Sequence, residues 1–419
     1  METPQTSRAA PDRGQLAIDG GQPIRRNTLP AWPFYSKDEI ESVASVLRSG
    51  KVNYWTGEQG RLFEAEFARF CGCKRAVAVA NGTVALELAL LALGIGSGDE
   101  VIVPSRTFVA SATCVVIRGA TPVFADVDRN SQTLTVDTIA PLLTPRTRAI
   151  VAVHLAGWPC DMDPILSLAR ERSIYVIEDC AQAHGATYHG RKVGSLAEVA
   201  AFSFCQDKII STGGEGGMVL TDNEEIWKRV WMFKDHGRNY ELSMAKSGAR
   251  FRWIHDDIGT NFRLTEIQSA IGRVQLAHIE EQLATRRRNA EILSRYLREI
   301  PAIRVTEPPA DIVPAYYKYY AFVRPEKLAV GWNRDRIVDA IAAEGIPCGT
   351  GSCSEIYLEK AFSERWRPDH RLPVAQELGE TSLMFMVHPT LSEQDMHDTG
   401  KAVVKVMNVA AGTGFSIAA

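Results

Sequence analysis

Short apolar runs that alternate with helical segments between residues 76 and 221 constrain this fold more than any other feature. We predict strands at 76–80, 100–104, 121–126, 148–154, 174–178, 199–204 and 218–221, and helices at 83–94, 107–118, 163–172 and 224–235. Strands that are apolar on both faces and separated by helices are typical of a mostly parallel sheet covered on both sides. The sequence therefore predicts an α/β protein built on a large, mostly parallel seven-stranded sheet.

Polar residues follow several of these strands at the point where each strand ends. Asn81, Ser105 and Asp179 stand at such ends, and Lys208 lies in the polar turn after Phe204. Ligands of such sheets gather at the carboxyl ends of the strands. We therefore expect these residues to share one site.

Lys208 and Asp179 are the most informative pair chemically. A lysine between two buried strands is costly to desolvate, which suits it to nucleophilic or Schiff-base chemistry. A strand-end aspartate for the pyridinium nitrogen and a lysine for the aldehyde are what pyridoxal 5'-phosphate (PLP) requires. The simpler interpretations are a solvated loop lysine and an aspartate that caps the next helix.

The rest of the chain is predicted as an arm, a linking helix and a second domain. Residues 1–14 are polar and are expected to form a disordered arm, and residues 15–275 form the large domain, which includes an extended N-terminal stretch. A helical stretch at 264–298 links this domain to a smaller C-terminal α/β domain, which we place at 276–419.

Composition argues against several functional classes. The 419-residue chain has a net charge of −3 and no apolar run long enough for a membrane span, so we expect neither nucleic acid nor a membrane as a partner. Its N-terminus lacks the apolar stretch of a secretion signal, which predicts a cytoplasmic protein. The eight cysteines are scattered without zinc-binding spacing, so we expect no metal site.

Five motifs together resemble a known enzyme family. They are NGTVAL (81–86), SRTFVAS (105–111), IEDCAQAHG (177–185), FSFCQDK with GGEGG (202–217) and GTNFRLTEIQSA (259–270). In this order they resemble the DegT/DnrJ/EryC1/StrS group of sugar aminotransferases, which are PLP enzymes of fold type I in the aspartate-aminotransferase superfamily. The resemblance implies a fold-type-I PLP transferase that acts as a homodimer with shared active sites.

The resemblance also implies roles for eight residues. Lys208 is the catalytic residue: it would hold PLP as a Schiff base and move a proton between the substrate α-carbon and C4′ of the cofactor. Asp179 would pair with the pyridinium nitrogen, Gln182 would lie near the ring hydroxyl, and Phe108 would stack on the pyridine face unless it is a core residue. The phosphate would be bound by the four remaining residues, Gly82, Thr83, Ser203 and, from the neighbouring subunit, Asn261.

The implied reaction is transamination through pyridoxamine phosphate. L-glutamate or L-glutamine would give an amino group to a keto-sugar, most often nucleotide-activated, in the biosynthesis of a polysaccharide or an antibiotic. The opening IDGGQPIR (18–25) resembles inosose aminotransferases instead, so an L-glutamine-dependent inosose (cyclitol) aminotransferase is the alternative. Another fold-type-I reaction, such as decarboxylation or lyase chemistry, and a non-catalytic PLP-binding regulator are further alternatives.

Several other residues lie in segments that line the substrate mouth in this family, although each is as readily structural. These are Tyr54, Trp55, His154, His236, Arg238, Tyr319 and His388. Glu215 is expected to fix the glycine turn, and Glu58 is expected to form a solvated pair with Arg61.

Overall fold

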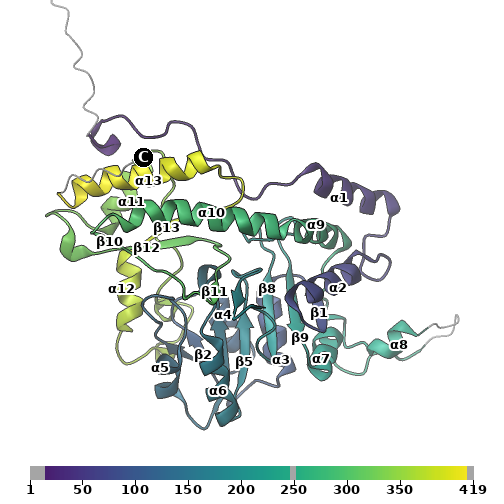
Figure 1. Ribbon diagram of the computed structural model, residues 1–419. Helices are drawn as coiled ribbons and strands as arrows, with labels where there is room; N and C mark the ends of the chain where they lie inside the picture. Colours follow the sequence, from purple (N-terminus) through teal and green to yellow (C-terminus); the bar gives the residue numbers. More distant parts are fainter. Residues whose placement is uncertain (1–14, 246–251, 413–419) are drawn as a thin grey trace, which may run out of the picture.

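A computed structural model describes residues 15–245 and 252–412, so the arm predicted at 1–14 lies outside the described residues. Figure 1 shows a central sheet covered by helices, with two long helices, α10 (Ile279–Arg298) and α13 (Glu393–Ala410), side by side above it.

A seven-stranded sheet forms the centre of the larger part of the chain. Its strands lie in the order β1 (Arg75–Val79), β9 (Gly217–Thr221), β8 (Val199–Ser203), β5 (Tyr175–Asp179), β4 (Thr147–Val153), β2 (Glu100–Pro104) and β3 (Thr121–Ala125). Strand β9 runs antiparallel to β1 and β8, and the other pairings are parallel. The predicted sheet is confirmed, and every predicted strand end lies within one residue of the observed end.

Helices bury both faces of this sheet. One face is covered by α2 (Gln59–Cys71), α5 (Val136–Ile139) and α6 (Met162–Arg172), and the other by α3 (Gly82–Ala92), α4 (Ala110–Ile117) and α7 (Glu224–Lys234). In β1, Ala76 and Ala78 face the first core, whereas Val77 and Val79 face the second. Because successive side chains alternate between two buried faces, these strands appear in the sequence as continuous apolar runs.

Local sequence explains where helices near the sheet begin and end. Ser36 and Glu39 form a capping box at the start of α1 (Lys37–Ser49), and Gly50 ends this helix in the left-handed conformation. Asn81 caps α3, because its side-chain oxygen accepts a hydrogen bond from the N–H of Val84 at 2.9 Å.

The helical stretch predicted at 264–298 is not continuous. It consists of α9 (Glu266–Ala277) and α10, which are separated at His278, where φ is −98° and ψ is 2°. The break lets α10 leave the direction of α9. Its first turns bury Ile279 and Leu283 in a core of the large sheet, and its later turns, from Ala290, enter a C-terminal core.

The C-terminal part has its own antiparallel sheet, in the order β10 (Ile303–Val305), β12 (Tyr319–Val323) and β13 (Ser382–Phe385). This sheet shares a core with α10, α11 (Arg334–Ala343) and α13, and α12 (Pro373–Thr381) packs beside β12. A small sheet of β11 (Ile312–Val313), β6 (Thr187–Tyr188) and β7 (Arg191–Lys192) ties this part back to the large one. Because α10 contributes to both cores, the boundary at residues 275 and 276 stays a prediction.

The buried guanidinium of Arg106 also joins the two parts. It follows β2 and donates hydrogen bonds to Gln132 Oε1 at 3.0 Å, to Ser354 Oγ at 2.7 Å and to Ser382 Oγ at 3.2 Å. Each acceptor is a neutral side chain, and two of them belong to the C-terminal part. Burial lowers the pKa of Arg106, because the charged form has left water.

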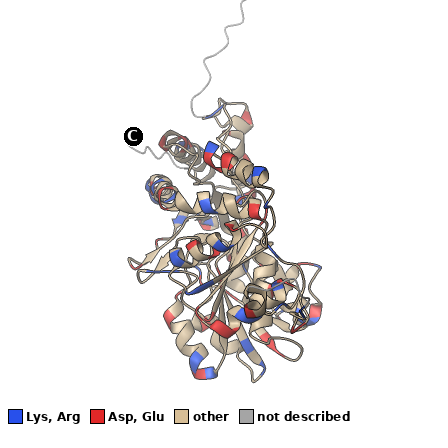
Figure 2. Ribbon diagram, turned by 90° about the vertical axis from the view of Figure 1, so that its right-hand side faces the viewer, with Lys and Arg blue, Asp and Glu red and all other residues tan. Residues whose placement is uncertain are grey.

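Shorter elements complete the described chain: α8 (Tyr240–Met244) and 3-10 helices at Ala17–Asp19, Ala140–Leu142, Leu155–Gly157, Pro325–Lys327, Ile356–Leu358 and Glu364–Trp366. Among the described helices, none combines the length and the apolar character that crossing a membrane requires. Figure 2 shows basic and acidic residues interspersed over the molecule.

Candidate active site

A cavity of about 590 Å³ opens where the central strands end. Its lining comes from both parts of the chain: Thr107, Phe108, Val109, Gln182 and Lys208 on the side of the large sheet, and Tyr317, Lys318, Tyr320, Gly351, Ser352, Cys353, Ile356, Glu359, Ala361 and Met384 on the C-terminal side. Three residues to which the resemblance gives a role, Phe108, Gln182 and Lys208, therefore meet in one cavity. Of the four strand-end residues expected to share a site, only Lys208 lines this cavity.

Lys208 lies in the turn after β8. Its side chain is 16% exposed, and its Nζ lies 3.4 Å from the hydroxyl of Tyr317. The backbone N–H of Lys208 donates to the carbonyl of Cys205 at 3.1 Å, and the Lys208 carbonyl accepts from the indole Nε1 of Trp32 at 3.0 Å. The amine thus points into the cavity, which argues against a solvated loop lysine.

The tryptophan that holds this turn belongs to the extended stretch at residues 15–35, which precedes α1 and is called the N-terminal arm from here on. Trp32 stacks on His388 with 6.1 Å between ring centroids, and the guanidinium of Arg286 lies 5.1 Å from its ring. The arm itself is anchored by Glu344, whose carboxylate accepts from the N–H groups of Ala17 and Ile24 at 2.8 and 3.0 Å. The backbone of the lysine turn is therefore fixed by residues from both ends of the chain.

Asp179 ends β5 and is buried. Its carboxylate accepts a hydrogen bond from Ser111 Oγ at 2.8 Å and one from the N–H of Ala181 at 3.1 Å. Burial raises the pKa of Asp179, while these two hydrogen bonds and the positive charge of Lys208 act in the opposite direction. A cationic partner at this position would therefore offset the free-energy cost of burying the carboxylate.

Gln182 and Phe108 present different groups to the cavity. The Oε1 of Gln182 accepts from the N–H of Ala156 at 2.7 Å, which fixes the amide and leaves its NH₂ group free to donate. Phe108 is 63% exposed. The alternative of a core phenylalanine is therefore wrong, and the ring has a face available for stacking.

Gly82, Thr83 and Ser203 lie together where α3 starts beside the end of β8. A Cβ on residue 82 would lie 2.5 Å from the Cβ of Ser203, so this approach requires glycine. Asn81 binds the N–H groups of Val84 and Ala85, whereas helix geometry leaves those of Gly82 and Thr83 without intrahelical partners. The three residues form a small cradle of hydrogen-bond donors.

Asn261 does not join the site within one chain. It is exposed, pairs with Asp235 in an isolated β-bridge, and accepts from the N–H of Arg263 at 3.3 Å through its side chain. It is absent from the lining of the 590 Å³ cavity. Its expected role from a neighbouring subunit stays a prediction.

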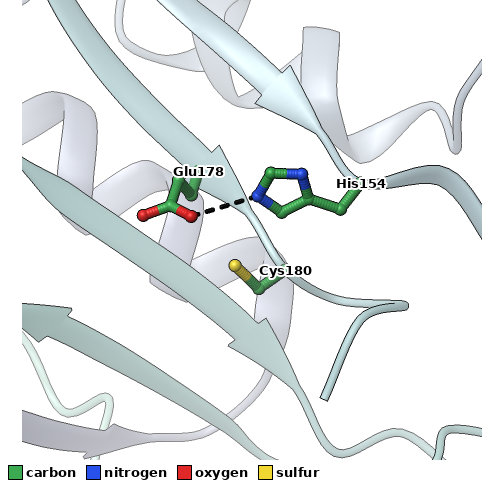
Figure 3. A group of neighbouring side chains, drawn as sticks. All are labelled: His154, Glu178 and Cys180. Carbon is green, nitrogen blue, oxygen red and sulfur yellow. Dashed lines mark hydrogen bonds and ion pairs between the residues drawn. The ribbon is translucent and has the colours of Figure 1, made fainter. Parts of the chain in front are cut away.

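His154, Glu178 and Cys180 form a buried group, and Figure 3 shows their side chains facing one another. His154 Nε2 lies 3.1 Å from Glu178 Oε2, and His154 Nδ1 accepts from the N–H of Cys160 at 3.0 Å. Glu178 also accepts from three backbone N–H groups at 194–197. Because these hydrogen bonds occupy the atoms of His154 and Glu178 that would ligate a metal, we interpret the group as structural.

None of the seven weaker candidates lines the 590 Å³ cavity. Tyr54, Trp55 and Tyr319 form hydrogen bonds with other side chains. Arg238 lies 3.9 Å from Asp235, and the backbone N–H of His236 donates to the carbonyl of Thr260. His388 lines a second cavity. The main chain of Glu215, and not its carboxylate, holds the glycine turn by accepting from Thr212 and Gln268. Arg61 donates to the carbonyls of Tyr54 and Gly57, and its solvated pair with Glu58 stays a prediction.

Sequence reasoning missed the C-terminal wall of the cavity. Tyr317, Lys318 and Tyr320 come from the run YYKYY at 316–320, which leads into β12. The available signal was a lysine inside an aromatic run at the start of a buried strand. Trp32 and Ser111, which hold Lys208 and Asp179, were missed because neither touches the cavity itself.

Comparisons with known proteins agree with this geometry. The sequence profile of the DegT/DnrJ/EryC1/StrS aminotransferase family matches residues 33–404. An aminotransferase of known structure from Psychrobacter cryohalolentis is 50% identical and superposes with a TM-score of 0.88, covering 90% of this chain and 98% of its own. GDP-perosamine synthase of Caulobacter vibrioides is 38% identical over 361 residues, which are 84% of this chain and 92% of that enzyme. L-glutamine:2-deoxy-scyllo-inosose aminotransferase of Streptoalloteichus tenebrarius is 35% identical over 416 residues, which are 94% of this chain and 97% of that enzyme.

The fold and these matches define the class of the protein, which is an aminotransferase with the predicted fold-type-I α/β architecture. Within that class, the chain belongs to the DegT/DnrJ/EryC1/StrS aminotransferase family. The resemblance seen in the five motifs is confirmed, and so is the prediction of a transaminase.

Proposed function

We propose that this aminotransferase uses PLP to move an amino group from L-glutamate or L-glutamine to the keto group of a nucleotide-activated sugar. The observation that carries the proposal is the meeting of Lys208, Gln182 and Phe108 in one cavity, beside the buried carboxylate of Asp179. When bound, PLP supplies an electron sink for the negative charge that develops on the substrate carbon.

The residues present fit this cofactor. The cradle of Gly82, Thr83 and Ser203, which a Cβ on residue 82 would fill, suits a phosphate at a helix N-terminus. The exposed ring of Phe108 suits stacking on a pyridine face, and the buried carboxylate of Asp179 suits a protonated ring nitrogen. Gln182 would donate to the ring hydroxyl and Lys208 would hold the aldehyde.

Each residue then has a defined task in the reaction. Once free of the aldehyde, the Nζ of Lys208 would take a proton from the amino-bearing carbon of the donor and deliver it to C4′ of the cofactor, and it would move a proton the opposite way with the acceptor. The hydroxyl of Tyr317, 3.4 Å away, orients this amine. The negative charge of Asp179 would attract the protonated ring nitrogen of the cofactor, and the burial of Asp179 strengthens this attraction.

A nucleotide-activated keto-sugar is the acceptor that we place first, supported by the similarity to GDP-perosamine synthase. A specific observation favours an inosose as the second candidate. The match to the inosose aminotransferase spans 94% of this chain and extends over more of it than the match to the perosamine enzyme does. A panel of keto-sugar nucleotides and 2-deoxy-scyllo-inosose, assayed with the same donor, separates the two.

We further propose that the active form is a homodimer in which each site borrows Asn261 from the neighbouring subunit. Ile258, three residues from Asn261, is 83% exposed, and Phe34 on the arm is 63% exposed. Exposed apolar side chains such as these are available for contact with a second protein surface. A second copy of this chain would cover them and would bring Asn261 to the cavity.

Mixing two inactive variants tests the shared site. In a heterodimer of Lys208→Ala and Asn261→Ala subunits, one site carries both changes and the other carries neither. If the sites are shared, mixing restores activity to one site of each heterodimer. If each chain uses its own Asn261, mixing restores nothing and the shared-site proposal fails.

Absorbance spectroscopy of the purified protein tests the reaction itself. We expect a visible band from the lysine-bound cofactor, its loss on addition of L-glutamate or L-glutamine, and no such band in Lys208→Ala. A band that neither donor bleaches would refute these donors. The failure to reconstitute any band with added PLP would refute the cofactor assignment.

A further inference from the structure

Lys318 separates two cavities at the active site. It lines the 590 Å³ cavity that contains Lys208, and it also lines a second cavity of about 520 Å³ between the N-terminal arm and the C-terminal part. Its side chain is 12% exposed. A lysine in this position has lost most of its water and must find other partners for its ammonium group.

The partners that it has do not satisfy three N–H donors. The Nζ of Lys318 lies 3.6 Å from Asp207 Oδ2 and 3.2 Å from the sulfur of Met386, a weak acceptor. Asp207 is itself shared, because it accepts from the hydroxyl of Tyr317 and lies 3.9 Å from the Nζ of Lys208. The ammonium of Lys318 therefore retains donor capacity toward the cavities.

Charge is also unbalanced around Asp207. Three basic side chains, Lys208, Lys318 and Arg286, act on this single carboxylate, and two of them, Lys318 and Arg286, remain free when Lys208 holds the aldehyde. Arg286 is buried, and its Nε and Nη2 atoms lack hydrogen-bond partners in the described chain. The excess of buried positive charge favours binding of an anion.

Lys208 and Lys318 lie beside the same carboxylate, because their Nζ atoms are 3.9 and 3.6 Å from the Oδ1 and Oδ2 atoms of Asp207. The Nζ atoms of Lys208 and Lys318 lie 4.8 and 4.7 Å from the centroid of the same ring, that of Tyr317. An amino acid whose amino-bearing carbon reaches Lys208 can therefore extend a carboxylate toward Lys318.

We propose that Lys318 binds a carboxylate of the amino donor while the donor's amino-bearing carbon lies at Lys208. The proposal rests on the proposed function, because it takes an amino acid as the donor. Every such donor has a carboxylate on the reacting carbon, and L-glutamate has a second one, whereas the keto carbon of a neutral sugar ring has none. Lys318 therefore determines specificity in the half-reaction with the donor.

The test compares Lys318→Met, which keeps the length and apolar stem of the side chain, with the wild-type holoenzyme. Bleaching of the visible band is followed at increasing concentrations of L-glutamate and L-glutamine. We expect the donor concentration for half-maximal rate to rise about 10- to 100-fold, the effect of losing a charge-assisted hydrogen bond, with a smaller change in the maximal rate. Lys318→Arg should recover most of the loss. Lys228→Met, at a surface lysine 3.0 Å from Glu241, should change nothing.

The two donors identify the carboxylate. An equal loss with both donors assigns the α-carboxylate to Lys318, and a loss with L-glutamate alone assigns the side-chain carboxylate. Unchanged donor dependence in a folded Lys318→Met overturns the proposal. Weaker binding of UDP with unchanged donor dependence also overturns it, because the anion would then be a phosphate of the acceptor.

A binding measurement without turnover completes the test. Glutarate, a dicarboxylate without an amino group, should bind the wild-type holoenzyme in a calorimeter more tightly than it binds Lys318→Met. If that variant does not fold, competition with L-glutamate on the wild type decides: glutarate should compete, and the uncharged diamide should not. Equal competition overturns the proposal. A wild type that binds glutarate but is bleached by no donor refutes the proposed function alone.

Discussion

Replacing Asp179 by asparagine should separate the stability of the fold from the binding of the cofactor. Asparagine has the same shape, and its Oδ1 can still accept from the N–H of Ala181, as the carboxylate does at 3.1 Å. Its NH₂ group can donate to Ser111 Oγ, which can turn its own proton toward Thr107 Oγ1, 2.9 Å away. The hydrogen bonds of the site therefore survive the substitution without a buried unsatisfied group.

The magnitudes follow from this geometry. The free energy of unfolding of the cofactor-free protein should change by no more than about 1 kcal/mol, because both hydrogen bonds are replaced and the burial of a charge is avoided. The cofactor should lose a charge-assisted interaction of about 1.5–3 kcal/mol, which is roughly a 10- to 100-fold rise in its dissociation constant. Turnover should fall further, because an unprotonated ring nitrogen is a poorer electron sink.

Urea unfolding of the cofactor-free protein and titration of the visible band with PLP measure the two quantities separately. Ser111→Ala is the control, because it removes one hydrogen bond to Asp179 and leaves its charge in place. The reasoning is refuted if Asp179→Asn binds PLP and turns over like the wild type. A loss of more than about 3 kcal/mol in unfolding would refute the hydrogen-bond replacement instead.

Three further substitutions test other parts of the structure. Gly82→Ala should weaken the binding of PLP and lower the free energy of unfolding by about 1–3 kcal/mol, because the new Cβ would clash with Ser203. PLP titration and urea unfolding measure these two effects. Gly96→Ala, whose new Cβ would lie 3.6 Å from its nearest neighbour, should be neutral in both measurements. Arg106→Met should cost about 2–4 kcal/mol in urea unfolding, and a change below about 0.5 kcal/mol would show that this residue does not connect the two parts of the chain. Burial and the charge of Lys208 lower the pKa of His184 to about 3 in the folded protein. Because the unfolded chain binds this proton more readily, the stability of the wild type should fall as pH decreases from about 6.5 toward 3. His184→Phe should flatten this dependence, measured as the free energy of unfolding between pH 4.5 and 7, and an unchanged slope would show that the buried imidazole is not its source.

The sheet and the large-domain side of the site could be predicted because their signals are local. Strands such as 199–204 are buried on both faces and appear as apolar runs, Asp179 ends β5, and Lys208 lies in the turn after β8. Phe108 lay in a recognisable motif, although its exposure could not be known from sequence. The C-terminal wall escaped prediction because Lys318 reaches Asp207 across 110 intervening positions that no local pattern connects. Helices α12 and α13 were also not predicted, and the break at His278 was missed because Ile267, Ile271, Val274 and Ile279 continue a helical spacing across it.

The hydrogen bond from Trp32 to the carbonyl of Lys208 has a consequence for the nascent chain. The ribosome makes Trp32 early, but Arg286 and His388, which fix its ring, emerge much later. At roughly 5–20 residues per second, about 20–70 s separate the synthesis of Trp32 from that of His388. The central sheet can form during this interval, but the turn that carries Lys208 reaches its final shape only when the chain is almost complete. Incomplete chains released before His388 would thus contain the sheet without a finished lysine turn.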